Sequence, residues 1–197
     1  MLLLQPKADI HLGCLARNFY TIQSLVRDAK VMAVIKANAY GHGLLPIAHA
    51  LSEAGVYGFC VALISEAKEL IDGGIKNPVL HLGRISRDDL EIFQSGQVRC
   101  TINSMEDIEI LEKYGNQMGA ITTHLKIDTG MCRMGAHFDK TELLMNKLAE
   151  KQYIHVEAVF SHFSTAEEDD TQYRNWQLKR FQEVVGHAQR ILPDVQF

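Results

Sequence analysis

The residues best suited to chemistry lie in the segment from Val31 to Gly43. It begins as an apolar run, passes to a single lysine, Lys36, and continues as a turn of small residues that contains Tyr40 and two glycines. An apolar, largely β-branched run predicts a buried parallel strand. A desolvated lysine at the end of such a strand can form a Schiff base with an aldehyde. The alternative is a lysine whose amine leaves the core and reaches water.

Polar side chains also follow two later apolar runs. Asp128 and Arg133 come after the fifth run, and Ser161 and His162 end or follow the sixth. In a parallel barrel the chemistry collects at the carboxyl ends of the strands, which is also where Lys36 lies. Scattered surface residues would not all occupy that end. The placement therefore favours one shared site.

The elements that must position these residues are predicted from periodicity. Apolar runs predict six strands, at residues 31–36, 56–63, 78–82, 98–102, 121–127 and 154–160, and the start of a seventh at 194–197. Helical spacing predicts helices at 15–29, 44–54, 65–73, 86–96, 104–115, 141–151 and 171–192. Ser65, Ser86 and Ser104 are the predicted N-terminal caps. The last helix is expected to turn an apolar side inward, formed by Tyr173, Trp176, Phe181, Val184 and Ala188.

Six strand–helix units in a row predict a parallel sheet with helical crossovers. An open doubly wound sheet and a barrel both fit this alternation. No G-x-G-x-x-G sequence follows any of the predicted strands, which disfavours a dinucleotide-binding fold.

Three motifs resemble the alanine racemase family, in the order and at about the spacing found there. They are Lys36-Ala-Asn-Ala-Tyr40-Gly-His-Gly, Lys126-Ile-Asp-Thr-Gly-Met-Cys-Arg133-Met-Gly, and Phe160-Ser-His162-Phe. The resemblance runs from about Ile10 to the end of the chain. It implies an α/β fold of the TIM-type (β/α)8 barrel, incomplete here, and a pyridoxal 5'-phosphate (PLP) cofactor.

The resemblance also implies a role for each of these residues. Lys36 would form the Schiff base with PLP and act as the base on one face of the substrate. Tyr40 would contact the phosphate, although a packing tyrosine with its hydroxyl in solvent is the alternative. Arg133 would hold the phenolic oxygen of the cofactor ionised, and His162 would lie beside its ring. Lys126 matches a lysine that is carbamylated in some members, and the alternative is an ordinary ion pair between Lys126 and Asp128.

Cys132 departs from the family, which usually has glycine at this position. A side chain there needs room and a backbone angle that glycine adopts more easily. We expect a small buried thiol rather than a nucleophile. The histidines show no spacing with a carboxylate that would indicate a metal site, so none is predicted.

The implied reaction is the interconversion of L-alanine and D-alanine, which supplies D-alanine for peptidoglycan. In the family the opposing base is a tyrosine of a carboxyl-terminal β domain, supplied by the partner subunit. We therefore interpret residues 1–197 as one domain, most of the barrel of a longer homodimeric enzyme, without that β domain and inactive alone. Two alternatives remain: a stand-alone PLP-binding barrel without racemase activity, and a racemase for serine or another small amino acid.

Composition limits the other classes of protein. The chain has 197 residues and a net charge of −4 with no cluster of basic residues, so a nucleic-acid partner is not expected. The first six residues lack the pattern of a signal peptide, and no apolar run is long enough to span a membrane. The four cysteines, Cys14, Cys60, Cys100 and Cys132, are far apart, as free thiols of a cytoplasmic protein would be.

Overall fold

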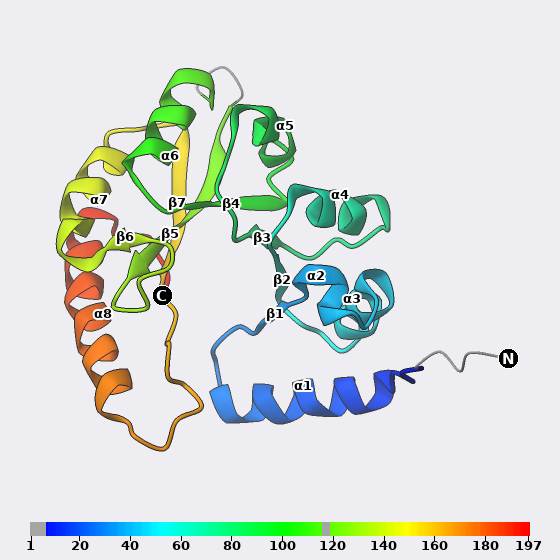
Figure 1. The fold of residues 1–197 in the computed structure, drawn as a ribbon. Helices are drawn as coiled ribbons and strands as arrows, with labels where there is room; N and C mark the ends of the chain where they lie inside the picture. Colours follow the sequence, from blue (N-terminus) through cyan, green and yellow to red (C-terminus); the bar gives the residue numbers. More distant parts are fainter. Residues whose placement is uncertain (1–6, 116–118) are drawn as a thin grey trace, which may run out of the picture. The chain divides into compact units, whose positions relative to one another are not determined.

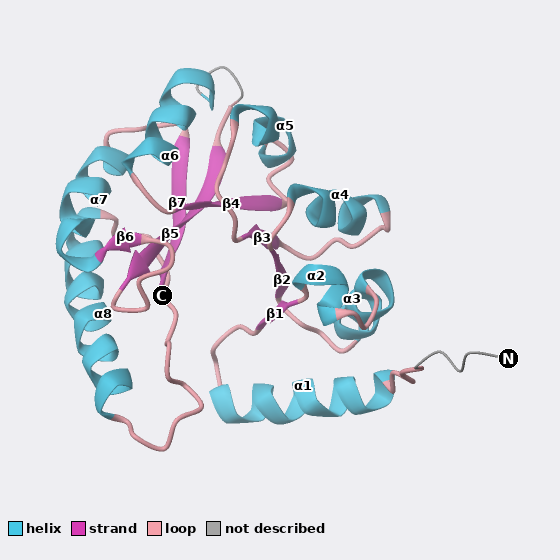
Figure 2. Ribbon diagram, in the orientation of Figure 1, coloured by secondary structure: helices cyan, strands magenta, loops and turns pink. Residues whose placement is uncertain are grey.

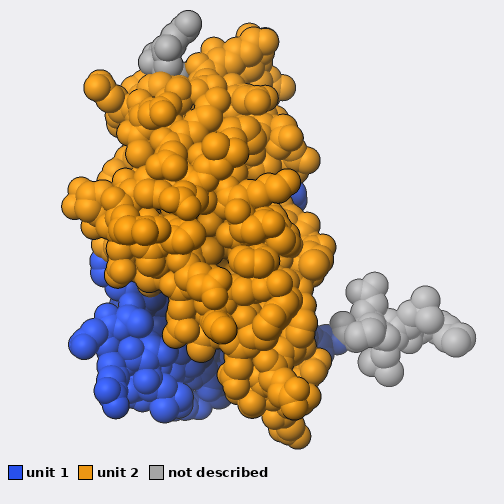
Figure 3. All heavy atoms as spheres, turned by 90° about the vertical axis from the view of Figure 1, so that its left-hand side faces the viewer, with its two compact units in different colours: residues 1–79 blue, residues 80–197 orange. Residues whose placement is uncertain are grey.

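The computed structural model describes residues 7–115 and 119–197. The chain divides into two compact units, residues 1–79 (unit 1) and 80–197 (unit 2), coloured separately in Figure 3. The predicted single domain over residues 1–197 stays a prediction. The first six residues, on which the argument against a signal peptide rests, lie outside the described part. None of the described helices combines the length and apolar character that a membrane crossing requires.

Unit 1 alternates helices with short strands (Figure 1). Its elements are α1 Leu12–Val26, β1 Met32–Val34, α2 Lys36–Tyr40, α3 Leu44–Glu53, β2 Gly58–Val61 and α4 Ile64–Asp72. Strands β1 and β2 are parallel, with Met32 opposite Gly58. Strand β2 is buried along its length, whereas β1 is only partly buried and Val34 is 43% exposed. The prediction of a buried first strand is thus wrong for β1, because among the described residues it pairs on one side only, with β2, and an edge strand is less covered than an inner one.

Unit 2 holds the longer strands and helices. Strand β3, Val79–His81, begins at the last residue of unit 1 and continues into unit 2. The remaining elements are η1 Arg87–Asp89, α5 Leu90–Phe93, β4 Val98–Ile102, α6 Met105–Ile110, the π-helical turn η2 Leu111–Gly115, β5 Ile121–Asp128, β6 Ala136–His137, η3 Phe138–Lys140, α7 Thr141–Ala149, β7 Ile154–Phe160 and α8 Gln172–Ile191.

The centre of unit 2 is β5, which pairs in parallel with β4, β6 and β7. Its apolar side chains, among them Ile121, Leu125 and Ile127, are essentially inaccessible to solvent. Helices α6, α7 and α8 lie outside these strands (Figure 2). Parallel strands that alternate with helices are typical of the α/β class, which the sequence predicted. Strand β6 was not predicted, because two residues are too short to show a period.

The end of the chain pairs with β7. Gln196 forms an isolated parallel bridge with Ala158. The Gln196 N–H donates to Glu157 O at 3.0 Å, and the Val159 N–H donates to Gln196 O at 2.9 Å. A seventh parallel strand that begins near residue 196 would form this pairing with β7, as the sequence predicted.

The predicted caps are confirmed at two of three helices. Ser86 and Ser104 are the N-caps of η1 and α6. Ser65 is not a cap, because α4 begins one residue before it and Leu63 is the N-cap. The Leu63 N–H instead donates to the carboxylate of Glu66 at 3.1 Å. A carboxylate in the first turn can serve an orphan N–H of the helix start as well as a hydroxyl does.

Helix α8 agrees with the prediction at Val184 and Ala188, which are buried, and at Phe181, which is partly buried, but not at its two other aromatic residues. Tyr173 and Trp176 are 42% and 41% exposed, whereas Gln177 is fully buried with Val184 and Ala188. The prediction placed the aromatic residues inside because of their apolar area. An amide can occupy the inward position here because the loops that it faces supply partners for both its oxygen and its nitrogen.

One charged cluster lies across β4, β5 and β7. Arg99 donates to both carboxylate oxygens of Glu157, at 3.0 and 3.1 Å, and His124 Nε2 lies 2.8 Å from the same carboxylate. These side chains are 9–23% exposed. The guanidinium of Arg99 lowers the pKa of Glu157 from 4.5 to about 2. Burial lowers the pKa of His124, so its ring is neutral at pH 7 and donates an ordinary N–H bond to Glu157.

Candidate functional site

Lys36 opens an unusual turn. Residues Ala37, Asn38, Ala39 and Tyr40 all have φ between 52° and 56°, so α2 is a left-handed turn built without glycine. A left-handed conformation costs roughly 1–2 kcal/mol for each such residue, because Cβ approaches the following carbonyl. Four in succession persist only where the surroundings fix them, and such strain gathers at functional sites.

Three hydrogen bonds that involve side chains hold this turn. Glu66 accepts the Ala37 N–H at 2.5 Å, and Asn38 Oδ1 accepts the Leu44 N–H at 2.7 Å. His42 Nδ1 lies 2.7 Å from Ala39 O and donates to it. Sequence reasoning gave no role to His42 or Glu66. Only the capping position of Glu66, three residues after Leu63, could have signalled it.

Lys36 and Tyr40 are both accessible within unit 1. Lys36 lies two residues beyond the end of β1 and is partly buried, following the buried Ile35. Tyr40 is 59% exposed. One helical turn separates the two residues, which places their Cα atoms roughly 6 Å apart at 1.5 Å of rise per residue. Lys36 and Tyr40 therefore lie at the two ends of one short, held turn.

In unit 2, the loop after β5 carries the second motif. Asp128 ends β5, and its Oδ1 accepts the N–H groups of Gly130 at 2.8 Å and Cys132 at 3.1 Å. The carboxylate thus shapes the loop that presents the exposed Arg133. Lys126 lies two residues before Asp128 in β5 and is 8% exposed. Its Nζ is 5.8 Å from the centre of the Phe160 ring.

Cys132 is exposed, and the prediction of a buried thiol is therefore wrong. Its sulfur lies 3.6 Å from Gly130 O, in the same exposed loop. Its φ is 57°, in the left-handed region that glycine adopts without strain. The expectation about the backbone angle is therefore confirmed.

Helix α8 fastens this loop from outside. Tyr173 donates its hydroxyl to Gly130 O at 2.6 Å, and Arg180 donates to Thr129 O at 3.2 Å. The Arg180 guanidinium also stacks over the Trp176 ring, with Cζ 3.3 Å from its centre. The exposed aromatics of α8 thus have a function in the fold that their burial pattern alone does not show. They hold the loop at one end of β5.

Gln177 links the ends of β5 and β7. Its Nε2 donates to Thr129 Oγ1 at 3.4 Å and to His162 O at 3.2 Å, and its Oε1 accepts the Ser164 N–H at 3.0 Å. Thr129 Oγ1 also lies 2.8 Å from the hydroxyl of Ser161. These bonds bring the segments that carry Arg133 and His162 to the same edge of the unit 2 sheet.

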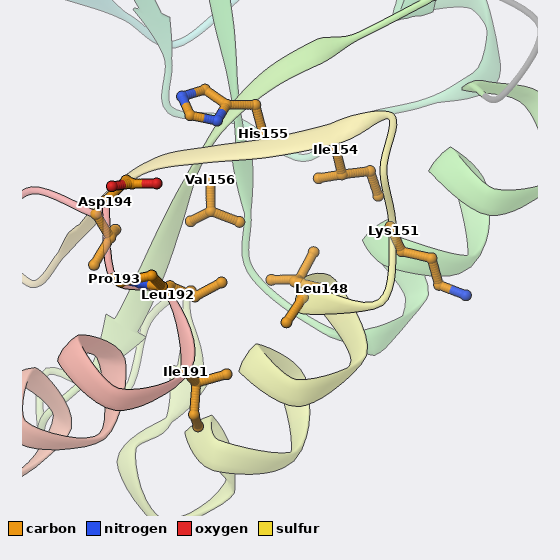
Figure 4. A pocket seen from close by; sticks show the side chains of 11 residues that line it. Leu148, Lys151, Ile154, His155, Val156, Ile191, Leu192, Pro193 and Asp194 are labelled. Atoms are coloured by element: carbon orange, nitrogen blue, oxygen red, sulfur yellow. The ribbon is translucent and has the colours of Figure 1, made fainter.

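Two cavities of unit 2 differ in their relation to these residues. One of about 100 Å³ is lined by Ser161, His162, Phe163 and Phe181, at the carboxyl end of β7. Another, of about 230 Å³, lies at the amino end of β7 and is lined by apolar side chains such as Leu148 and Val156 and by polar ones such as His155 and Asp194 (Figure 4). Of the predicted site residues, His162 lines the smaller cavity and none lines the larger one.

Gly130→Ala is expected to destabilise unit 2 by about 2 kcal/mol or more, because only glycine adopts this conformation without strain. Gly130 has φ 141°, and an added Cβ would stand 2.7 Å from Trp176 Cζ3 and 2.9 Å from the Tyr173 hydroxyl. Denaturant unfolding measures the loss. Gly96→Ala is the control: its φ is 68° and its Cβ would meet nothing within 4 Å. It should cost only about 1 kcal/mol. Equal losses in both variants would contradict the close packing of α8 on this loop.

The chain is similar to known proteins over most of its length. The family described as "Alanine racemase, N-terminal domain" matches residues 10–196. An alanine racemase of Desulforamulus reducens is 36% identical over 185 residues, which are 92% of this chain and 50% of that protein. One of Streptococcus pneumoniae is 34% identical over 190 residues, 96% of this chain and 51% of that protein.

Solved structures similar to this chain are also alanine racemases. Alanine racemase from Bacillus anthracis with bound L-Ala-P superposes with a TM-score of 0.86 at 27% identity, over 96% of this chain and 52% of that one. Alanine racemase from Clostridium difficile in complex with cycloserine gives 0.84 at 28% identity, over 91% and 51%. The predicted TIM-type barrel, present in part, is thereby confirmed. The chain spans about half the length of the relatives it matches, and it belongs to the alanine racemase N-terminal domain family.

Proposed function

We propose that this chain is the part of an alanine racemase that holds PLP, and that the enzyme interconverts L-alanine and D-alanine. The observation that carries this proposal is the left-handed turn that begins directly after Lys36. Four strained, non-glycine residues, fixed by bonds from other elements, are what a structure maintains when the position of one lysine matters.

The chemistry of the available groups fits the cofactor. PLP offers an aldehyde, a phosphate and a phenolic oxygen, which call for an amine, hydrogen-bond donors and a cation. Unit 1 supplies the amine of Lys36 and the exposed phenol of Tyr40. Unit 2 supplies Arg133, which is exposed, and the imidazole of His162, which lines a cavity. A phenol donates well to a phosphate, and a guanidinium stabilises an anionic oxygen.

Each residue then has a proposed task. When bound, PLP supplies an electron sink for the electron pair left by loss of the substrate α-proton. The Lys36 amine holds the cofactor and, once free, takes the α-proton of D-alanine. Tyr40 donates to the phosphate, and Arg133 keeps the phenolic oxygen negative. His162 lies beside the ring, and Lys126 is proposed to carry a carbamate that orients Arg133.

Further parts of the proposal concern the whole enzyme. We infer a homodimer in the cytoplasm that supplies D-alanine for peptidoglycan, with the 197 residues alone unable to racemise alanine. The four cysteines have no disulfide partners among the described residues, which supports a reducing compartment. The choice of alanine over serine is supported by the names of the relatives and by the L-Ala-P in the Bacillus anthracis structure.

Borohydride reduction of the PLP-loaded chain, followed by peptide mapping, tests the proposal. Borohydride fixes the cofactor on the lysine that holds it, and we expect the label at Lys36. Labelling of another lysine would refute the assignment. A parallel assay of D-alanine formation by the chain, and by the racemase that contains it, tests the reaction. A racemase active on serine but not on alanine would change the substrate, and a labelled protein that racemises neither would indicate a PLP-binding module.

A further inference from the structure

We propose that Glu66 is a positioning residue for Lys36. Its buried carboxylate fixes the backbone immediately after Lys36 and thereby determines where the amine stands. This inference rests on the proposed function, since a defined amine position matters only if Lys36 holds the cofactor. Glu66 itself does not touch the reacting atoms.

Three backbone N–H groups converge on this carboxylate. Oε2 accepts the N–H groups of Ala62 at 3.0 Å and Leu63 at 3.1 Å, the two residues between β2 and α4. Oε1 accepts the N–H of Ala37 at 2.5 Å. Glu66 is only 8% exposed, so these bonds are shielded from water. Bonds to an ionised acceptor are about twice as strong as neutral ones.

The bond to Ala37 is not needed to cap a helix. An N-terminal carboxylate completes its capping with the N–H groups at its own helix start, and Oε2 alone does so here. Oε1 instead reaches a residue 29 positions earlier in the chain. The second oxygen therefore has a different effect, which is to attach the turn of α2 to the start of α4.

The backbone of Lys36 is consequently held on both sides. Before it, the Ile35 N–H donates to Cys60 O at 2.9 Å, in continuation of the pairing between β1 and β2. After it, the Ala37 N–H donates to Glu66. Ala37 is also the first left-handed residue, with φ 53°. A long, flexible side chain can present its amine reproducibly only from a fixed Cα, and small misplacements of a reacting group are costly.

Glu66→Gln separates the two tasks of the carboxylate. The amide keeps one acceptor oxygen, which will face the two N–H groups of Ala62 and Leu63, because two bonds outweigh one. Its NH2 group then faces the Ala37 N–H, and two donors repel. We expect the affinity for PLP and the borohydride labelling of Lys36 to fall about tenfold, since losing a charge-assisted bond in a part-buried position costs about a factor of ten. The absorption band of the bound cofactor should weaken in parallel.

Asp107→Asn is the matched control. Asp107 is also fully buried in the first turn of a helix, and its Oδ2 accepts the Asn103 N–H at 2.8 Å, but it lies in unit 2 at the start of α6. Both variants should lose folding stability, whereas only Glu66→Gln should lose Lys36 labelling. Equal labelling in the two variants would overturn the proposal.

A third variant distinguishes positioning from instability. Adding Ala37→Gly to Glu66→Gln relieves the left-handed strain, because glycine adopts this conformation freely. Stability should partly return while Lys36 labelling stays low, because the anchor is still missing. Recovery of labelling together with stability would show that Glu66 acts only on folding. If the unmodified chain is not labelled at Lys36, the proposed function fails, and this outcome is distinct from a failure confined to Glu66.

Discussion

Lys36→Arg is expected to abolish the covalent fixation of PLP and to lower alanine racemisation by about a thousandfold. Arginine keeps the positive charge and much of the length, but its guanidinium is neither a nucleophile nor a base at neutral pH. A positioned acid–base group alone contributes about 10²–10⁴-fold to a rate. The measurements are peptide mapping after borohydride reduction of this chain and D-alanine formation by the racemase that contains it.

Lys30→Arg is the control for this substitution. Lys30 lies in the same unit, with Nζ 4.6 Å from the centre of the Tyr57 ring, and a guanidinium can keep that stacking contact. The control should retain both labelling and racemisation. Racemisation that survives in Lys36→Arg to within tenfold would contradict the role of Lys36, whatever the control shows.

Glu157→Gln is expected to destabilise unit 2 by about 2–3 kcal/mol at pH 7, which follows from the shift in its pKa with an allowance for partial exposure. The amide cannot neutralise Arg99, whose guanidinium is 14% exposed and now lacks a negative partner. Removing one partner of a largely buried ion pair leaves the other charge uncompensated. Urea unfolding of the variant and the parent measures the difference.

The pH dependence of this difference has a definite sign. The pKa of Glu157 falls from 4.5 to about 2 on folding, so its contribution is complete above pH 4.5 and is lost as the pH falls toward 2. The pKa of His124 is also lowered, by burial, so the unfolded chain binds a proton below pH 6.5 that the folded chain does not. Both groups therefore make unit 2 less stable in acid. The parent and Glu157→Gln should converge in stability as the pH approaches 2.

Glu112→Gln is the control for Glu157. Glu112 pairs with Lys151 at 2.6 Å and Lys147 at 3.4 Å, in side chains that are 24–34% exposed, but it lacks the two-bond guanidinium contact that Arg99 makes with Glu157. Its loss should cost less than about 1 kcal/mol. A difference between Glu157→Gln and the parent that stays constant from pH 7 to pH 3 would show that the ionised carboxylate is not what stabilises the cluster.

The sequence by itself determined the order of the strands and helices and the segments that carry chemistry. Apolar runs and the 3.6-residue period reflect which side chains face a core. The runs located β4 and β7 with the correct bounds, and the period located most helices to within a few residues. The three motifs indicated the family through residue identity and spacing alone. Such signals are local, because they depend on residues a few positions apart.

Only the tertiary structure decided how the site is held. The left-handed turn after Lys36 has no signature in Ala37 or Ala39, since alanine favours right-handed helices and is turned here only by bonds from elsewhere. The partner that fixes it, Glu66, is 29 residues from Ala37, and the bond from Gln177 to Thr129 spans 48 residues. The inward turn of Gln177 was likewise settled by loop residues 13 to 48 positions away in the chain. Hydropathy ranks side chains by their transfer from water, whereas these positions depend on whether a distant donor or acceptor is within reach.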